Sequence, residues 1–361
     1  MLMMQVLQTK VASYQEVGGQ LIVNEEPFAV LVLTPIMIRG HSLSEAANIC
    51  FVDSTASCDV ENHSITFMLT TCAAGAVPLA VIITASQNEA SYCSGFQLLR
   101  DCGRSLFGGA NHPHVFLTDD SAAEQAALHN TWSDSMLRLC LFHVAQANWR
   151  WLWEAKNGIA KNDRPQLMQE FQLVMRADSV DKAQDQYTTA VTSATAAKYP
   201  HWIHRLEVYW SRHEMWCVAW RTAIQRGHHT NNYSEVTVRL FKDIVLSRCK
   251  AYNTVALVDF IFTTMENYYC NRLLDFAHSR VPTRRLWLRR QTDKASYVTP
   301  NMIEQTAESV FTVQSQSSND VWHTVDVTLG VCSCHDGISG KFCKHQAAVL
   351  VHFPGSVLHK S

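Results

Sequence analysis

Two apolar runs joined by a short glycine-bearing turn occupy residues 64–84, which read SITFMLTTCAAGAVPLAVIIT. Both runs are rich in β-branched residues, and the turn Cys72-Ala-Ala-Gly75-Ala suits a hairpin. A further strand-sized apolar run, Asn48–Val52, lies just upstream. We therefore predict three strands in quick succession, Asn48–Val52, Ser64–Thr71 and Val77–Thr84, which form an antiparallel meander.

Helical and strand patterns alternate downstream of this meander. Apolar residues at helical spacing from Tyr92 to Cys102 predict a helix, and the apolar run His114–Leu117 predicts a buried strand. The polar segment Thr118–Ser121 begins another helix, and Met136–Val144 is predicted to be a strand. The order β-β-β-α-β-α-β predicts an α/β fold with a mixed sheet, and it is the strand order of ribonuclease-H-like folds.

The segment that follows has a helical pattern and is rich in tryptophan, from about residue 145 to residue 225. We interpret it as an all-α insertion. Its tryptophans are best explained as helix core, and a base-stacking platform at Trp149, Trp151 and Trp153 is the alternative.

Two carboxylates are predicted to meet at one edge of the sheet. Asp53 follows the first strand and Asp119 follows the fourth, and these strands are neighbours in such a sheet. Asp120 is adjacent to Asp119, but side chains alternate along a strand, so only one of them can join Asp53. We choose Asp119 because it directly follows the apolar run. Taken singly, either aspartate is more often a strand-end or capping residue.

A third carboxylate, Glu235, lies in a helix that is predicted to begin at Thr230-Asn231-Asn232 and to run through Leu246. On its own this glutamate would be explained by its favourable position in the first turn of a helix. Together with Asp53 and Asp119 it offers oxygen ligands for two Mg²⁺ or Mn²⁺ ions. Such a pair of ions suits in-line displacement at phosphorus, which is phosphodiester chemistry.

A second, different ligand set lies near the C-terminal end, where Cys332 and Cys334 are separated by eight residues from Cys343 and His345. Three thiolates and one imidazole form the tetrahedral set that a structural Zn²⁺ prefers. Two glycines between the pairs allow the chain to fold back. Chance placement of the cysteines is the weaker explanation at this spacing. Strand-like alternation over residues 310–328 leads into the cluster.

Composition limits the class of protein without selecting a partner. The 361 residues are 47 % hydrophobic, which favours packed cores, and the formal net charge of −2 gives no general attraction to nucleic acid. The twelve cysteines are dispersed and no signal peptide is visible, so we expect an intracellular protein. No apolar run is long enough to span a bilayer, and no membrane partner is expected.

The densest basic segment could supply local contacts to DNA. It contains five arginines around Trp287, namely Arg280, Arg284, Arg285, Arg289 and Arg290. These side chains could neutralise several phosphates, and a solvated helix face explains them equally well.

The ordered set of motifs resembles Mutator-like element (MULE) transposases of the DDE type, which carry a SWIM zinc finger. The motifs are Asp53-Ser-Thr55, Thr118-Asp119-Asp120, Cys140-Leu-Phe-His143, Thr230-Asn-Asn-Tyr-Ser-Glu235 and the Cys/His cluster, and the resemblance spans roughly residues 28–354. It implies that Asp53, Asp119 and Glu235 are catalytic.

The resemblance also implies the supporting residues and the partners. Asp120, Cys140, His143, Asn231 and Asn232 would support the site. The implied activity is cleavage and joining of DNA at element ends and targets in the nucleus, and the oligomeric state, including a homo-oligomer, stays open. No Cys/His cluster precedes Asp53, so recognition of the element ends is expected to depend on other parts.

We expect four segments, with boundaries taken from these patterns. They are a lead-in segment 1–45, a catalytic domain 46–275 with its insertion at about 145–228, a basic segment 276–309 and a zinc finger 310–355. Two other functions remain open at this stage. The chain could be a catalytically silent transposase-derived protein that binds DNA or chromatin, or a zinc-finger adaptor for protein partners.

Overall fold

The computed structural model describes residues 2–221, 229–278 and 290–353, except for residues 308, 317, 319, 328–329 and 339–341. Within this part the chain forms two compact units, Met1–Leu273 and Leu274–Ser361. Each unit has its own sheet and its own hydrophobic core. None of the described helices is both long and apolar enough to cross a bilayer.

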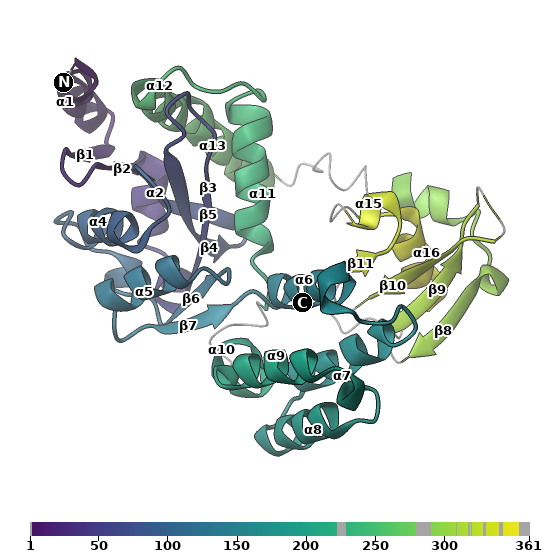
Figure 1. Ribbon diagram of the computed structural model, residues 1–361. Coiled ribbons are helices and arrows are strands. Elements are labelled where there is room, and N and C mark those ends of the chain that lie inside the picture. Colours follow the sequence, from purple (N-terminus) through teal and green to yellow (C-terminus); the bar gives the residue numbers. More distant parts are fainter. Residues whose placement is uncertain are drawn as a thin grey trace. The chain divides into compact units, whose positions relative to one another are not determined.

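A seven-stranded mixed sheet organises the first unit (Figure 1). Its strands are β1 (Gln20–Asn24), β2 (Ala29–Leu33), β3 (Ile49–Thr55), β4 (Ser64–Cys72), β5 (Gly75–Thr84), β6 (Val115–Thr118) and β7 (Met136–Leu139), in the spatial order β1-β2-β5-β4-β3-β6-β7. The β4–β5 hairpin and the antiparallel β3–β4 pair confirm the predicted meander. The β3–β6 and β6–β7 pairs are parallel, so the predicted mixed sheet is also confirmed.

The structure differs from the sequence prediction at two places in this sheet. The predicted strand Met136–Val144 ends at Leu139, because Cys140 becomes the N-cap of helix α6 (Leu141–Trp153). Both halves of the prediction are apolar, and periodicity over so few residues does not separate a strand from a buried helical turn. Residues 20–33, placed in a lead-in segment, instead supply the β1–β2 hairpin, whose β2 pairs with β5.

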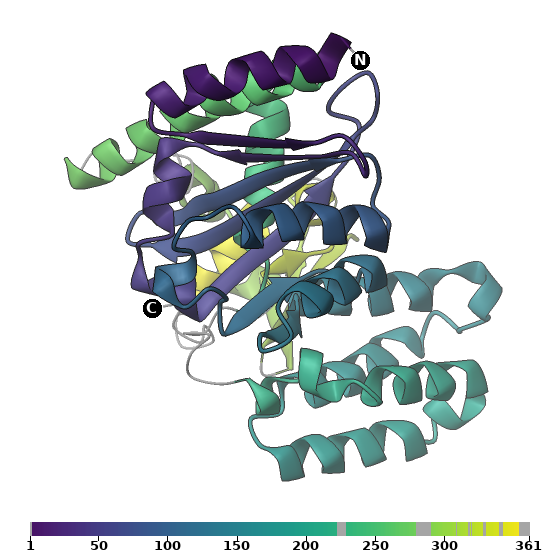
Figure 2. The same ribbon diagram turned by 90° about the vertical axis from the view of Figure 1, so that its left-hand side faces the viewer.

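Helices cover both faces of the sheet (Figure 1). One face packs against α4 (Glu89–Arg100) and α5 (Ala122–Thr131). The other packs against α1, α11, α12 and α13, and Figure 2 shows α1 in dark purple alongside the green helices of this layer. Their bounds are α1 (Leu2–Glu16), α11 (Asn232–Leu240), α12 (Thr254–Phe260) and α13 (Glu266–Ala277), with π-helical turns at Phe241–Val245 and Ile261–Met265.

The alternation of side chains along β3 assigns each residue to one of these two layers. Phe51 is buried in the core shared with α11, and Val52 is buried in the core shared with α4 and α5. By the same alternation, Asp53 faces the α11 side and Ser54 faces the α5 side. The two faces of this strand end therefore present different chemistry.

The predicted helical insertion follows β7. Its helices are α6 (Leu141–Trp153), α7 (Arg164–Arg176), α8 (Val180–Thr192), α9 (Pro200–Trp210) and α10 (His213–Trp216), with 3-10 turns at Ala155–Asn157, Ala196–Lys198 and Val218–Trp220. Phe171, Trp202 and Trp216 are fully buried and in ring contact, which agrees with a core role for most of its aromatic residues. Trp149 and Trp153 differ, since they are 40 % and 48 % exposed. Short helices α2 (Pro35–Gly40) and α3 (Ser44–Asn48) and a turn at Phe107–Gly109 complete the first unit.

The second unit contains a four-stranded antiparallel sheet. Its elements are a turn at Pro300–Met302, β8 (Ile303–Ala307), β9 (Val310–Gln314), β10 (Trp322–Asp326), β11 (Val331–Cys332), α15 (His335–Ile338) and α16 (Lys344–His352). Strand β8 pairs with β9 although it lies in the segment 276–309 that the sequence separated from the zinc finger. Strand β8, with the sequence Ile-Glu-Gln-Thr-Ala, has only one large apolar residue and therefore gives little strand signal.

Candidate metal and phosphodiester site

The register of β3 and β6 brings two of the predicted carboxylates to one place. Phe51 pairs with Leu117 in the parallel ladder, and Asp53 and Asp119 each lie two positions further along. Two positions along a strand return the side chain to the same face. Phe51 and Leu117 both belong to the core shared with α11, so both aspartates lie on that side of the sheet.

Asn231 fixes the start of α11, the helix that carries Glu235, against the end of β3. Its side-chain amide nitrogen donates to the carbonyl of Val52 over 2.9 Å, and its side-chain oxygen Oδ1 accepts from the Ser234 hydroxyl over 2.6 Å. Asn231 is fully buried, and its backbone N–H donates to the Cys140 sulfur over 3.1 Å. We expected this polar segment to cap the helix. Instead, the Asn231 side chain makes no capping bond and joins the helix to the strand next to Asp53.

Asn232 occupies the first position of α11 and is exposed. Among the described residues no hydrogen bond links its side chain to the carboxylates. Of the two asparagines, the structure therefore places Asn231 in contact with the strand that carries Asp53, whereas Asn232 makes no such contact among the described residues.

His143 lies between Asp119 and Glu235, in the first turn of α6. Its Nδ1 donates to Asp119, and its Nε2 lies 3.1 Å from an oxygen of Glu235. The second contact has ion-pair distance but no hydrogen-bond alignment, so that buried Glu235 oxygen has no hydrogen-bond partner. The Cys140 sulfur is also close, because ligand atoms of Asp119, Cys140 and His143 lie within 4.8 Å of one another.

Burial and the charges of neighbouring residues shift the pKa values of Asp53, Glu235 and His143. Burial and the nearby charge of Asp119 raise the pKa of Asp53 to about 7. Burial also raises the pKa of Glu235. Burial alone would lower the pKa of His143, but its hydrogen bonds to Asp119 and Cys140 outweigh burial and raise that pKa to about 11.

The donor set fits divalent cations that prefer oxygen. With all groups charged, three carboxylates face one imidazolium, which leaves a surplus of negative charge. Among the described residues, the Asp53 carboxylate has no ion-pair partner, and Glu235 keeps an oxygen without a hydrogen bond. Hard oxygen donors of this kind suit Mg²⁺ or Mn²⁺.

Asp120 points into a different environment from Asp119. Its carboxylate pairs with the guanidinium of Arg212, which follows α9, with Nη2 and Oδ2 2.6 Å apart. This pair links the end of β6 to the helical insertion. It leaves Asp119 as the aspartate that contacts His143.

A fourth carboxyl group, which the sequence analysis missed, lies directly behind the site. Glu124 is only 2 % exposed, and its carboxyl group is hydrogen bonded to Ser54 and Thr118, the residues next to Asp53 and Asp119. Burial raises the pKa of Glu124 to about 8. The sequence Ser121-Ala-Ala-Glu124 is typical of a capping box, which suggests only a helix start. The polar residues Ser54 and Thr118, at the ends of two predicted apolar strands, were the only sequence signal that a buried partner such as Glu124 faces them.

This carboxyl group predicts a dependence of stability on pH. The pKa of Glu124 is raised from its ordinary 4.5 to about 8, so the native state favours the protonated carboxyl group. The contribution of this group to the free energy of unfolding is therefore complete below pH 4.5 and is lost as pH rises through 8. Relative to Glu124→Gln, the native protein should lose up to about 1.4 kcal/mol of unfolding free energy per pH unit in this window. Urea unfolding of both proteins from pH 5 to 8 measures this difference. Equal slopes would show that Glu124 does not titrate as argued.

The second unit holds the predicted Cys/His cluster. Cys332, Cys334, Cys343 and His345 are buried, and their ligand atoms lie within 4.8 Å of one another. The His345 Nδ1 is 3.8 Å from the sulfurs of Cys332 and Cys343. A hydrogen bond with Cys332 outweighs burial and lowers the pKa of Cys343 to about 4. The donor set and its compactness fit Zn²⁺.

Glycine at position 337 is required by this cluster. A Cβ atom there would lie 2.3 Å from the carbonyl oxygen of Cys332, closer than real Cβ contacts. The Gly337 N–H donates to the Cys334 sulfur over 3.3 Å, and the Cys334 N–H donates to the Cys332 sulfur over 3.4 Å. The chain therefore folds back tightly at Gly337, with backbone donors aimed at sulfur, whereas Gly340, the other glycine of the prediction, lies outside the described residues.

Comparison with known proteins bears on the first unit. Residues 50–147 match the MULE transposase domain. The comparison with curated proteins gave no match.

The MULE transposase domain match includes both strand-end aspartates, Asp53 and Asp119, and the Cys140–His143 motif. Glu235 and the Cys/His cluster lie outside the matched residues. The match supports the resemblance found in the sequence and indicates a transposase or a protein derived from one.

The structure describes only one of the five predicted DNA-binding arginines. Arg280, Arg284, Arg285 and Arg289 lie outside the described residues, and Arg290 is exposed.

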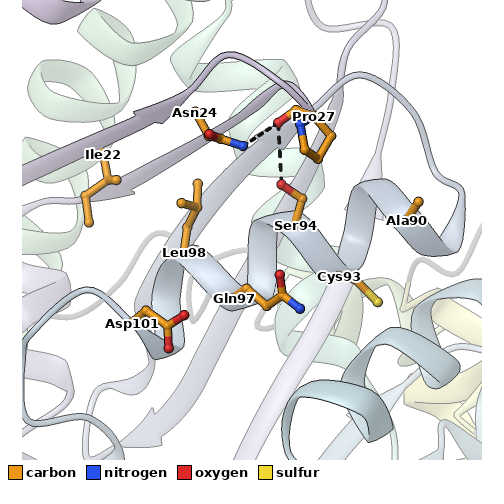
Figure 3. A pocket seen from close by; sticks show the side chains of 9 residues that line it. All are labelled: Ile22, Asn24, Pro27, Ala90, Cys93, Ser94, Gln97, Leu98 and Asp101. Carbon is orange, nitrogen blue, oxygen red and sulfur yellow. Dashed lines mark hydrogen bonds between the residues drawn. The ribbon is translucent and has the colours of Figure 1, made fainter.

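A hollow of about 490 Å³ lies between α4 and the β1–β2 turn, where Asn24 and Ser94 donate to the carbonyl of Pro27 (Figure 3). Its lining includes none of the predicted site residues.

Proposed function

We propose that this chain is a DDE-type transposase, or a close derivative that retains catalysis, and that it cleaves and joins DNA phosphodiester bonds. The observation that carries the proposal is the convergence of Asp119 and Glu235 on His143, with Asp53 electrostatically coupled to them. The MULE transposase domain match over residues 50–147 supports it independently.

A ribonuclease-H-like fold is part of the proposal. The sheet has three antiparallel strands, β3 to β5, followed by the parallel β6 and β7, with helices on both faces. Asp53 lies near the end of the first of these strands, and Asp119 directly follows the fourth. This arrangement supports a ribonuclease-H-like core to which β1 and β2 are added at one edge.

Asp53, Asp119 and Glu235 would hold two Mg²⁺ or Mn²⁺ ions. When bound, such ions activate an attacking oxygen and stabilise a leaving oxygen at phosphorus. The other residues orient these three ligands. Asn231 fixes the start of α11 against β3, and His143 holds a proton on Nδ1 against the Asp119 carboxylate.

Glu124 secures the two aspartates from behind. By bonding to Ser54 and Thr118, it ties the ends of β3 and β6 together on the face opposite the carboxylates. Catalytic groups act efficiently only when their positions are fixed in advance.

The second unit would be a SWIM-type zinc finger with Cys332, Cys334, Cys343 and His345 as ligands of one structural Zn²⁺. The zinc would contribute folding free energy to a unit with a small core. DNA, as element ends and target, is the proposed partner, and a nuclear location follows from that substrate.

Nicking of supercoiled plasmid DNA tests this proposal without knowledge of the element ends. The zinc-loaded protein should convert supercoiled to nicked circles in Mg²⁺ or Mn²⁺, and it should not nick DNA when both ions are omitted. Folded, zinc-loaded protein that binds DNA but never nicks it or joins a supplied strand would favour the catalytically silent alternative.

A further inference from the structure

A hollow of about 320 Å³ lies between α6 and α9 of the helical insertion. Its lining combines aromatic, cationic and imidazole side chains, contributed mainly by Trp151, His201, His204, Arg205 and Tyr209. This composition differs from that of the hollow beside α4, which has no aromatic side chain in its lining. Aromatic faces beside cationic groups are the usual composition of sites for unpaired nucleotides.

Arg205 is the central cation of this hollow, and it is held in place. Its Nε donates to the side-chain oxygen Oδ1 of Asn148 over 2.7 Å, and Asn148 is fully buried. The guanidinium carbon lies 5.3 Å from the ring centre of Trp151 and 5.2 Å from that of Tyr209. Because rotamer freedom is already lost, a ligand that binds this guanidinium would have little further ordering to overcome.

The Arg205 cation also lacks a carboxylate partner among the described residues. Burial lowers its pKa, and the charges of Glu154 and Asp120 act on it only from beyond ion-pair distance. Buried charges in proteins are usually paired, so a bound anion would complete the environment of this guanidinium. His204 contacts Glu207 at 3.6 Å, but both side chains are largely exposed and that pair is weak.

Helix α6 and a set of side-chain contacts through Arg212 link the hollow to the carboxylate site. Helix α6 carries His143 in its first turn and Trp151 eight residues later, about 12 Å along the axis. Arg212 lies 5.1 Å from the Tyr209 ring centre and pairs with Asp120, next to Asp119. A separation of about 12 Å corresponds to roughly three to four base steps of a stacked strand.

We propose that this hollow binds an unpaired nucleotide of the DNA strand being cut, with its base against Trp151 and its phosphate on Arg205. This inference rests on the proposed function, since it assigns the flank of the same substrate. Stacking on an aromatic ring tolerates any base, so the site would select unpaired structure and not sequence. The two imidazoles of His201 and His204 border the phosphate position.

Binding of labelled DNA in buffer without added Mg²⁺ or Mn²⁺ tests the proposal apart from cleavage and leaves the zinc site undisturbed. The full-length, zinc-loaded protein is titrated by fluorescence anisotropy with a blunt duplex and with the same duplex carrying a four-nucleotide single-stranded tail. We expect the tail to raise affinity about tenfold, and Trp151→Leu to remove most of that gain. The double variant His201→Ala/His204→Ala, at two exposed positions, should reduce the gain about threefold.

Tyr252→Leu is the matched control, because Tyr252 is an exposed aromatic of the same unit that does not line the hollow. It should leave the gain unchanged. Equal affinity for blunt and tailed DNA in the native protein would overturn the proposal, as would an unchanged gain in both the Trp151 and the histidine variants. A native protein that nicks DNA but shows no gain from the tail overturns only this inference, whereas a native protein that shows the gain but never nicks DNA overturns only the proposed function.

Discussion

Replacing Asp53 with Asn is expected to reduce Mg²⁺-dependent nicking by at least about 10³-fold, with little loss of stability. The substitution keeps the shape of the side chain and removes its negative charge. Burial and the charge of Asp119 already disfavour that charge, as the raised pKa of Asp53 shows. A transition state stabilised by metal ions loses several kcal/mol when one ligand becomes neutral. The Asn231–Val52 bond next to it does not involve the Asp53 side chain and should persist. Single-turnover nicking of supercoiled plasmid measures the effect.

Glu235→Gln should have a similar effect, because Glu235 is the ligand supplied by a separate element, α11. The matched control is Asp101→Asn, which neutralises an exposed aspartate at the end of α4 outside the site. Nicking that survives both site variants within tenfold of the native rate would exclude the three-carboxylate mechanism. Nicking lost equally in the control would point to a general effect of charge.

Removing zinc is expected to unfold the second unit and to leave the first unit folded. The three cysteines are part of the second unit's small core, together with Phe311 and Val325, so loss of the metal would disturb that core directly. Structural zinc sites in small domains contribute on the order of 10 kcal/mol at neutral pH. Amide hydrogen exchange after chelation, or in Cys343→Ser, should show loss of protection in β9 and β10 and retained protection in β3 and β4.

Cys249→Ser serves as the control, because Cys249 is an exposed thiol in the first unit. It should change neither exchange nor zinc content. If chelation leaves β9 and β10 protected, the cluster is not a structural metal site. If it also exposes β3 and β4, the two units do not fold independently.

The sheet and the carboxylate pair were predictable because they depend on periodicity and register. Two apolar runs joined by a glycine-bearing turn predicted β4 and β5, and the rule that neighbouring parallel strands end together placed Asp53 with Asp119. The choice of Asp119 over Asp120 followed from side-chain alternation, and the structure places Asp119 against His143 and Asp120 against Arg212. The Cys/His spacing likewise predicted a compact cluster.

The remaining features depend on contacts between distant segments. Glu124 has the sequence context of a helix cap, and only the packing of α5 on the sheet turns it toward Ser54 and Thr118. Asn231 similarly has the context of a cap, but it bonds to β3 across 179 positions of sequence. The hollow at Arg205 requires α6 and α9 to lie together, which no local pattern specifies.

Mn²⁺ binding to the full-length, zinc-loaded protein without DNA tests the central claim most directly, because it does not depend on the sequence of the element ends. Electron paramagnetic resonance titration should show Mn²⁺ bound by the native protein. Asp119→Asn should weaken binding at least tenfold, since it removes the negative charge of a proposed oxygen ligand. Asp120→Asn should leave binding within twofold, because that carboxylate pairs with Arg212. Native protein that binds no Mn²⁺, or binding lost in Asp120→Asn and kept in Asp119→Asn, would contradict the account.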